Sequence, residues 1–231
     1  MLIEIENHPM RLSEVGRMLS ITVQEASRQL DRLAEAKLVS KNPESKFEIT
    51  SFGRAALARL PSFRFIELNR DFILSHDLSG LPTPFVHRLG ELSGARPINQ
   101  LDQAIAHAEE VVTGARKYVW LLSDQSMRQS YPHEHPAEVE FRSIFPKDID
   151  PEIVKRIRSR IGPSLQVARL DKVKLSLAMN ETTAAVCFPD LQGRMDFTRG
   201  FAGEDHDFHA WCHDLYESFW DGAREESERN L

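Results

Sequence analysis

The sequence of 231 residues predicts a mixed α+β protein in two parts: a small helical part that ends in a β-hairpin, and a larger α/β sandwich with a mixed sheet. Three observations support this prediction. Two closely spaced helix-start signals and a polar turn with proline occupy the first 50 residues. A break with glycine and proline follows at 78–84. Beyond it, helical and strand patterns alternate, as they do when helices pack on a sheet.

Composition excludes several classes of protein. Hydrophobic residues make up 41% and charged residues 28%, which is typical of a globular chain. No apolar run reaches the ~20 residues of a membrane span, and the acidic start lacks the pattern of a secretory signal. Two cysteines, Cys187 and Cys212, fit a reducing compartment, so we expect a cytoplasmic protein without a membrane partner. The net charge of −6 argues against non-specific coating of nucleic acid, but it permits a small DNA-reading face.

The charge is unevenly distributed along the chain. Residues 1–77 carry 11 basic and 11 acidic side chains, whereas residues 78–231 carry 18 and 24. Within 8–46 the count is 7 basic against 5 acidic, a mild excess of the sign that phosphates attract. An ordinary mixed surface would give the same count.

Two helices joined by a short turn are predicted near the N-terminus, after a short leading helix at 1–8. We expect Ser13 to cap the first of the two and Thr22 to cap the second, where Glu25 completes a capping box. The second helix buries Ala26, Leu30 and Leu33, and its opposite face presents Gln24, Glu25, Ser27, Arg28 and Arg32. This is a helix-turn-helix arrangement, whose second helix has the size to enter a major groove.

A β-hairpin follows these helices. Residues 38–41 and 46–50 read as short strands on either side of the polar turn at 42–45. Such a hairpin is the wing of a winged helix, and Lys41 and Lys46 at its base are placed to reach phosphates.

The order of these elements closely resembles the winged helix-turn-helix of archaeal and bacterial ArsR-like regulators. Their typical Ser-Arg-x-Leu-x-x-Leu-x-x-Ala-Gly-Leu-Val pattern stands here at 27–39 as SRQLDRLAEAKLV. The departure is Lys37, where the family usually has a left-handed glycine cap, so the end of this helix is expected to differ. The predicted double-stranded DNA contacts are Thr22, Gln24, Glu25, Ser27, Arg28, Arg32, Lys41 and Lys46. Of these, Gln24, Ser27 and Arg28 would read or flank base edges, and Arg32, Lys41 and Lys46 would neutralise phosphates.

We expect three regions: a DNA-binding domain at 1–60, a connecting or dimerisation helix at 61–78, and a second domain at 79–231. The connector is predicted as one helix over 62–77 with a broad apolar face that needs a partner. The second domain should contain helices at 101–112, 151–161 and from 205 or 207 onward, with strands at 118–122, 139–144, 165–169, 174–179 and 184–188.

The chain beyond the wing resembles archaeal regulators with a C-terminal FilR1-type domain. The segments that carry the resemblance are NRDFILSHDLSGLP at 69–82, RLGEL at 88–92, FPD at 188–190 and RGF at 199–201. A further match is WC followed by DL at 211–215. The resemblance implies an archaeal transcription regulator whose second domain is distantly like one half of a phospholipase D. That domain would sense an effector or dimerise rather than catalyse a reaction.

The residues give little sign of catalysis or of a cofactor. Phospholipase D chemistry needs a histidine followed two residues later by lysine, and none of the nine histidines has one. We therefore expect no enzyme. His206, His209 and His213, with Cys212 beside them, share a helix face and are a candidate zinc or nickel site. A second, looser candidate is the segment His133-Glu134-His135. The favoured interpretation is a packing face with solvated histidines.

The sequence therefore predicts a homodimeric, sequence-specific DNA-binding regulator whose second domain senses an unidentified small-molecule effector or dimerises. Two half-sites would be needed because one recognition helix buries little surface. The alternatives are a winged-helix protein-interaction module and a metal sensor that uses His206, His209 and His213.

Overall fold

The computed structural model describes residues 1–123 and 138–229, with side chains to residue 223. It forms two compact units, Met1–Arg64 and Phe65–Leu231. The division falls inside the segment predicted as a connector, because Phe65 already belongs to the core of the second unit. Among the described helices, none is long and apolar enough to cross a membrane.

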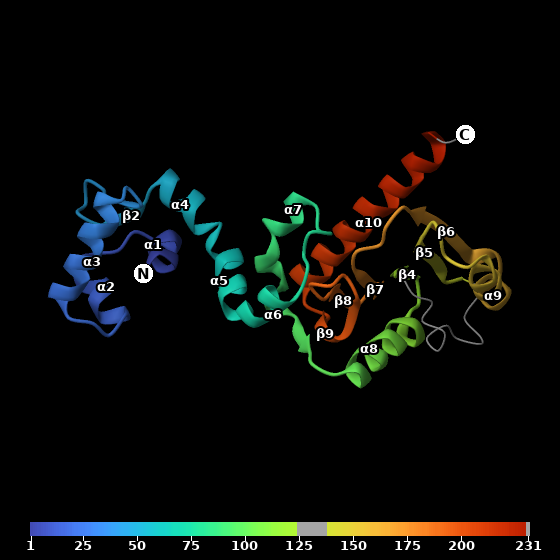
Figure 1. Cartoon of the computed structure of the whole chain (residues 1–231). Helices are drawn as coiled ribbons and strands as arrows, with labels where there is room; N and C mark the ends of the chain where they lie inside the picture. The colour runs from blue at the N-terminus through green and yellow to red at the C-terminus, as the bar shows by residue number, and fades with distance from the viewer. Residues whose placement is uncertain (124–137, 230–231) are drawn as a thin grey trace. The chain divides into compact units, whose positions relative to one another are not determined.

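The first unit is a winged helix (Figure 1). Its elements are α1 (Leu2–Asn7), α2 (Leu12–Met18), α3 (Val23–Glu35), β1 (Val39–Lys41), β2 (Phe47–Ile49) and α4 (Ser51–Leu57). The predicted hairpin is confirmed: β1 and β2 pair antiparallel, with Val39 opposite Ile49. Met10 adds an isolated bridge to Phe47 on the outer side of the hairpin. The buried core comprises Ile5, Met10, Val15, Ala26, Leu30, Val39, Phe47, Ile49 and Leu57.

The turn between α2 and α3 is closed by backbone hydrogen bonds. Ser20 takes a left-handed conformation (φ 55°), and the Ile21 amide donates to the Gly16 carbonyl at 3.0 Å. A Cβ at Gly16 would lie 3.3 Å from the Ile21 carbonyl oxygen and 3.8 Å from the Ala26 Cβ. Small residues at both positions thus let the two helices approach closely.

The first of these two helices is capped differently from the prediction. Ser13 lies within α2, and Arg11 is the N-cap residue. The Arg11 amide donates to Glu14 Oε2 at 2.7 Å, so the glutamate side chain satisfies a backbone donor at this helix start. The helix begins one residue before Ser13, which removes that hydroxyl from the capping position.

Helix α3 ends in the left-handed cap that glycine usually provides, although Lys37 occupies that position. Lys37 has φ 61°, and its amide donates to the Ala34 carbonyl while the Leu38 amide donates to the Leu33 carbonyl. These two bonds form a Schellman motif. The expectation that this end would differ from the family pattern is therefore wrong, and the lysine accepts the left-handed conformation.

Thr50 and Gly53 connect the start of the wing to helix α4 through hydrogen bonds and close packing. The Thr50 hydroxyl donates to the Lys37 carbonyl at 2.6 Å and accepts from the Gly53 amide at 2.9 Å. A methyl group at Gly53 would overlap the Leu38 carbonyl oxygen. The spacing of threonine and glycine in this segment is thus a packing requirement.

The single helix predicted over 62–77 is two helices, α5 (Leu60–Leu68) and α6 (Arg70–Ser75). Asn69 separates them with φ −108° and ψ 28°, and its side-chain amide donates to the Phe65 carbonyl at 2.9 Å. Beyond α6, the imidazole of His76 is buried. Its Nδ1 is hydrogen-bonded to the Phe72 carbonyl, and its Nε2 lies 3.2 Å from Asp196 Oδ2. The end of α6 is thereby fixed within the second unit.

Within the described residues, the second unit is built on a mixed sheet, as predicted, and this sheet has seven strands where five were expected. Its order is β3-β9-β8-β7-β4-β5-β6, in which β4, β5 and β6 run parallel and the other neighbours are antiparallel. The strands are β3 (Arg96–Ile98), β4 (Tyr118–Leu122), β5 (Glu140–Pro146), β6 (Leu165–Leu170), β7 (Ser176–Asn180), β8 (Ala184–Pro189) and β9 (Met195–Gly203). The helices are α7 (Thr83–Val86), α8 (Leu101–Gly114), α9 (Pro151–Ile161) and α10 (His206–Arg229), with short 3₁₀ turns η1 (Leu89–Gly94) and η2 (Gly162–Ser164).

Two hydrophobic cores lie on opposite faces of this sheet (Figure 1). Along β4, Trp120 and Leu122 face the core that contains α10, whereas Val119 and Leu121 face the core that contains α8 and α9. This alternation makes a three-layer sandwich. The three tryptophans are core residues, each 5% exposed or less.

Candidate nucleic-acid interface

Helix α3 presents a polar surface to solvent. Gln24, Arg28 and Arg32 are exposed, while Ala26 and Leu30 are completely buried beneath them. Thr22 starts the helix as predicted, because its hydroxyl accepts from the Glu25 amide at 3.1 Å. The helix has 13 residues and therefore the length and diameter of a groove-reading helix.

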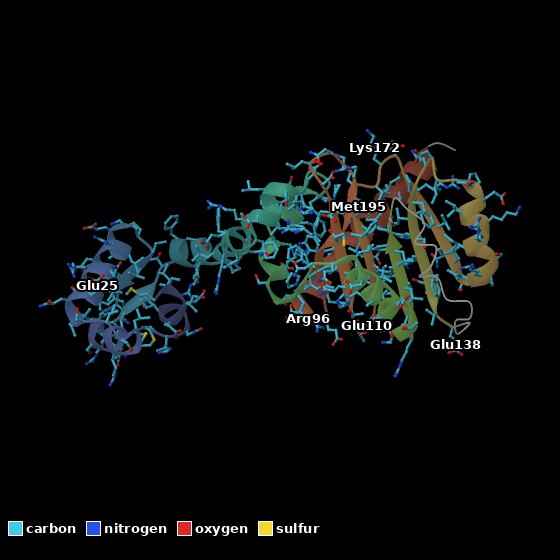
Figure 2. The ribbon with its side chains drawn as sticks, turned by 60° about the horizontal axis from the view of Figure 1, so that its bottom comes forward. Glu25, Arg96, Glu110, Glu138, Lys172 and Met195 are labelled. Carbon is cyan, nitrogen blue, oxygen red and sulfur yellow. The ribbon has the colours of Figure 1, made fainter. Side chains whose placement is uncertain are left out.

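Glu25 organises the side chains at the start of this surface. Its carboxylate accepts from Arg28 Nη2 at 2.6 Å and from Gln29 Nε2 at 2.7 Å. The hydrogen bond from Gln29 and the charge of Arg28 lower the pKa of Glu25 below 4.5. The Arg28 guanidinium is still 70% exposed, so the pair holds it at the surface of the helix. Figure 2 shows Glu25 at the rim of the first unit.

The rest of α3 carries nearly balanced charges. Ser27 donates to Asp31 at 3.4 Å, and Arg32 is exposed on the next turn. Together with Glu25 and Glu35, the helix has three acidic and two basic side chains. A strong positive field therefore has to come from outside α3.

The wing supplies two such cations. Lys41 ends β1, with its Nζ 5.0 Å from the centroid of the Phe47 ring, and Lys46 precedes β2 with its Nζ 2.8 Å from Glu44. Between them, the Asn42 side chain accepts from the amides of Glu44 and Lys46, at 3.0 Å each, and so closes the turn. Both lysines flank the turn at the tip of the wing and not its base, where the sequence analysis expected them.

The sequence analysis missed two further residues that can donate hydrogen bonds to a phosphate, His8 and the cation Arg17. His8 and Arg17 line a shallow hollow together with Lys46, Glu14 and neighbouring apolar side chains. The hollow joins the α1–α2 connection, α2 and the wing, so these residues converge only in the folded unit. A helical period places Arg17 on the exposed side of α2, and that was the available signal.

The structure does not bring the three candidate metal ligands together. His206 is fully exposed, with its Nδ1 3.1 Å from Asp207. His209 Nε2 bonds to the Asn180 carbonyl at 2.7 Å, and the His213 ring lies 5.0 Å from that of Trp120. Cys212 is buried, and this burial raises the pKa of its thiol. Within the described residues, no group of three or more histidine, cysteine or acidic side chains is placed to hold a metal ion. His133 and His135 lie outside the described residues.

Comparisons with known proteins found similarity among solved structures but no matching family. No protein-family model matches the chain, and no curated protein matches it. One similar solved structure is TrmBL2, described as an archaeal chromatin protein with a novel mode of DNA binding. The two chains are 13% identical, the match covers 96% of this chain and 90% of TrmBL2, and the TM-score is 0.42. At this identity the likeness assigns neither a family nor a function.

Proposed function

We propose that this protein is a sequence-specific DNA-binding transcription regulator that acts as a homodimer. The observation that carries the proposal is the helix-turn-helix with its wing, in which α3 buries Ala26 and Leu30 and exposes Gln24, Arg28 and Arg32. An arginine held at the surface of such a helix can donate two hydrogen bonds to a guanine edge. Arg32, Lys41 and Lys46 would bind backbone phosphates, and His8 and Arg17 would extend this set.

A second copy is required by the small contact area of one recognition helix. Two half-sites about 34–36 Å apart would double the buried surface. The exposed side of α5 supplies an apolar face for that contact: Leu60 is 48%, Phe63 68% and Ile66 36% exposed. These residues recur at i, i+3 and i+6 on the side of the helix opposite the buried Phe65. We propose that this α5 face forms the dimer interface.

The direct test selects bound duplexes from a random pool with the full chain and then measures affinities at the selected site. We expect Arg28→Ala to weaken binding there by about 1–3 kcal/mol and to relax the preference at one base position. Arg32→Ala should weaken binding to all sequences and reduce the salt slope by about 1. Arg96→Ala, an exposed arginine on β3 of the second unit, is the matched control and should leave both quantities unchanged.

Two results would contradict this proposal. Retention of no duplex at low ionic strength would remove DNA as the partner. Equal affinities of Arg28→Ala and Arg96→Ala at the selected site would remove α3 as the reading helix.

A second candidate function is a protein-interaction module. The observation in its favour is the balance of charge on α3, where Glu25, Asp31 and Glu35 accompany two arginines. Salt separates the candidates: phosphate contacts give log K a steep dependence on log salt concentration, and mixed-charge protein contacts give a shallow one. The ArsR-like and FilR1-type resemblances, and the effector they imply, stay predictions, since no family model matches the chain.

A further inference from the structure

Helix α9 carries a concentration of positive charge in an otherwise acidic unit. The second unit as a whole has 19 basic and 27 acidic residues. Within Pro151–Ile161 the ratio reverses to four basic side chains against one acidic, Glu152. The four are Lys155, Arg156, Arg158 and Arg160, here called the α9 basic face.

The packing of α9 directs these cations outward. Val154, Ile157 and Ile161 are buried in the core beneath the sheet and fix the inner side of the helix. Helical spacing then places Lys155 with Arg158 along one outer row, and Arg156 with Arg160 along another, on either side of Ser159. Arg158 also lines a shallow hollow with Gly162, Pro163 and Leu165. Figure 2 shows α9 at the end of the sheet, with its outer side chains directed into solvent.

Among the described residues, Arg156, Arg158 and Arg160 differ from those arginines of the second unit that are paired with carboxylates. Arg88 pairs with Glu91 and Asp214, and Arg142 pairs with Glu140 and Glu217. On α9, Lys155 lies 3.5 Å from Glu152. Among the described residues, no carboxylate lies within ion-pair distance of Arg156, Arg158 or Arg160.

Compensation of the helix dipole accounts for part of this pattern only. Arg158 and Arg160 lie in the last turn, where cations are stabilised by the carbonyl end of the helix. Lys155 and Arg156 lie mid-helix, outside that range. A face with four cations in six residues and few internal partners therefore matches an external anion of regular charge spacing.

We propose that the α9 basic face binds the backbone phosphates of a DNA duplex, independently of sequence, as a second contact besides the winged helix. The inference rests on the proposed function, because that function supplies the duplex. Three of the four cations are arginines, whose planar guanidinium donates two parallel hydrogen bonds to a phosphate. The two rows give the face enough width to contact phosphates of more than one nucleotide.

The test measures duplex affinity as a function of salt for the full chain. Each of two row variants removes one outer row of cations: Arg156→Gln/Arg160→Gln and Lys155→Gln/Arg158→Gln. The control variant is Arg96→Gln/Lys172→Gln. The control removes two exposed cations that lie far apart on the same unit (Figure 2). Each lost phosphate contact should make the slope of log K against log salt concentration less negative by about 0.9, so a row variant should change it by about 1.8. The base preference of the selected site should not change.

The outcomes separate the two proposals. The α9 contact is supported if at least one of the two row variants has a slope of log K against log salt concentration that is less negative than that of the control. If both row variants have the same slope as the control variant while the wild type binds duplex, the α9 contact is wrong and the proposed function is unaffected. A wild type that retains no duplex refutes the proposed function itself. Weaker binding of the row variants to polyglutamate, with duplex binding unchanged, overturns the inference in favour of an acidic protein partner.

Discussion

Lys37 takes the backbone conformation that glycine usually provides after a helix. Its φ of 61° places the Cβ against the following carbonyl, at a cost of roughly 1–2 kcal/mol for a residue other than glycine. The Schellman bonds of Lys37 and Leu38 and the lock from Thr50 Oγ1 to the Lys37 carbonyl hold it there. Tertiary contacts therefore outweigh the local preference at this residue.

We expect Lys37→Gly to stabilise the first unit by about 1 kcal/mol, since the left-handed conformation is free of strain in glycine. Urea denaturation followed by circular dichroism measures this difference. Lys37→Ala keeps a Cβ and should match the wild type. A midpoint for Lys37→Gly no higher than that for Lys37→Ala would contradict the strain at this residue, whereas a midpoint for Lys37→Ala below that of the wild type would show that the lysine side chain itself stabilises the unit.

At the scale of the element, Glu181 holds the start of β4. Its carboxylate accepts from the amides of Arg116 at 2.8 Å, Lys117 at 3.2 Å and Tyr118 at 3.4 Å. Burial raises the pKa of Glu181, but these backbone hydrogen bonds outweigh it and leave the pKa below 4.5. The β7–β8 turn is thereby tied to the first residues of a central strand.

Glu181→Gln should destabilise the second unit by about 1 kcal/mol near neutral pH, because an amide cannot accept all three bonds. A carboxyl with a lowered folded pKa contributes stability above its unfolded pKa and loses it as the pH falls through the folded value. The difference between variant and wild type should therefore shrink as the pH falls below 4.5. Denaturation midpoints across this range measure it, with Glu109→Gln on the exposed side of α8 as the control. A difference that does not change with pH would contradict the charged role of Glu181.

At the scale of the whole molecule, charge divides between the two units. Met1–Arg64 has 10 basic and 8 acidic residues, whereas the second unit has 8 more acidic than basic residues. Under the proposed function, a duplex would be attracted to the first unit and to the α9 basic face and repelled by most of the remaining surface. Such a distribution favours a defined contact over general coating of DNA.

The proposed dimer makes a prediction at this scale. Phe63→Glu places a charge at the centre of the α5 face and should convert a dimer into a monomer, measured by light scattering after size exclusion. Leu191→Glu replaces a leucine of similar exposure (62% against 68% for Phe63) in the β8–β9 turn and should leave the dimer intact. Equal masses for the two variants would exclude the α5 face as the interface.

Most helices and strands were predictable because their signals are local. Thr22 as a cap, the period of Ala26 and Leu30, and the polar turn of the wing all act within a few residues. The predicted strands at 118–122 and 184–188 are confirmed for the same reason. Strands β3 and β9 were missed, since Arg96–Ile98 is short and Met195–Gly203 contains glycines that weaken the strand pattern.

The sequence alone determined the helix-turn-helix, the wing and the alternation of helices and strands, because caps, turns and hydrophobic periods are short-range. Only the tertiary structure decided the order of the seven strands and the dispersal of His206, His209 and His213. The physical reason is that these outcomes depend on burial and hydrogen bonding between segments far apart in the chain, which no local pattern specifies.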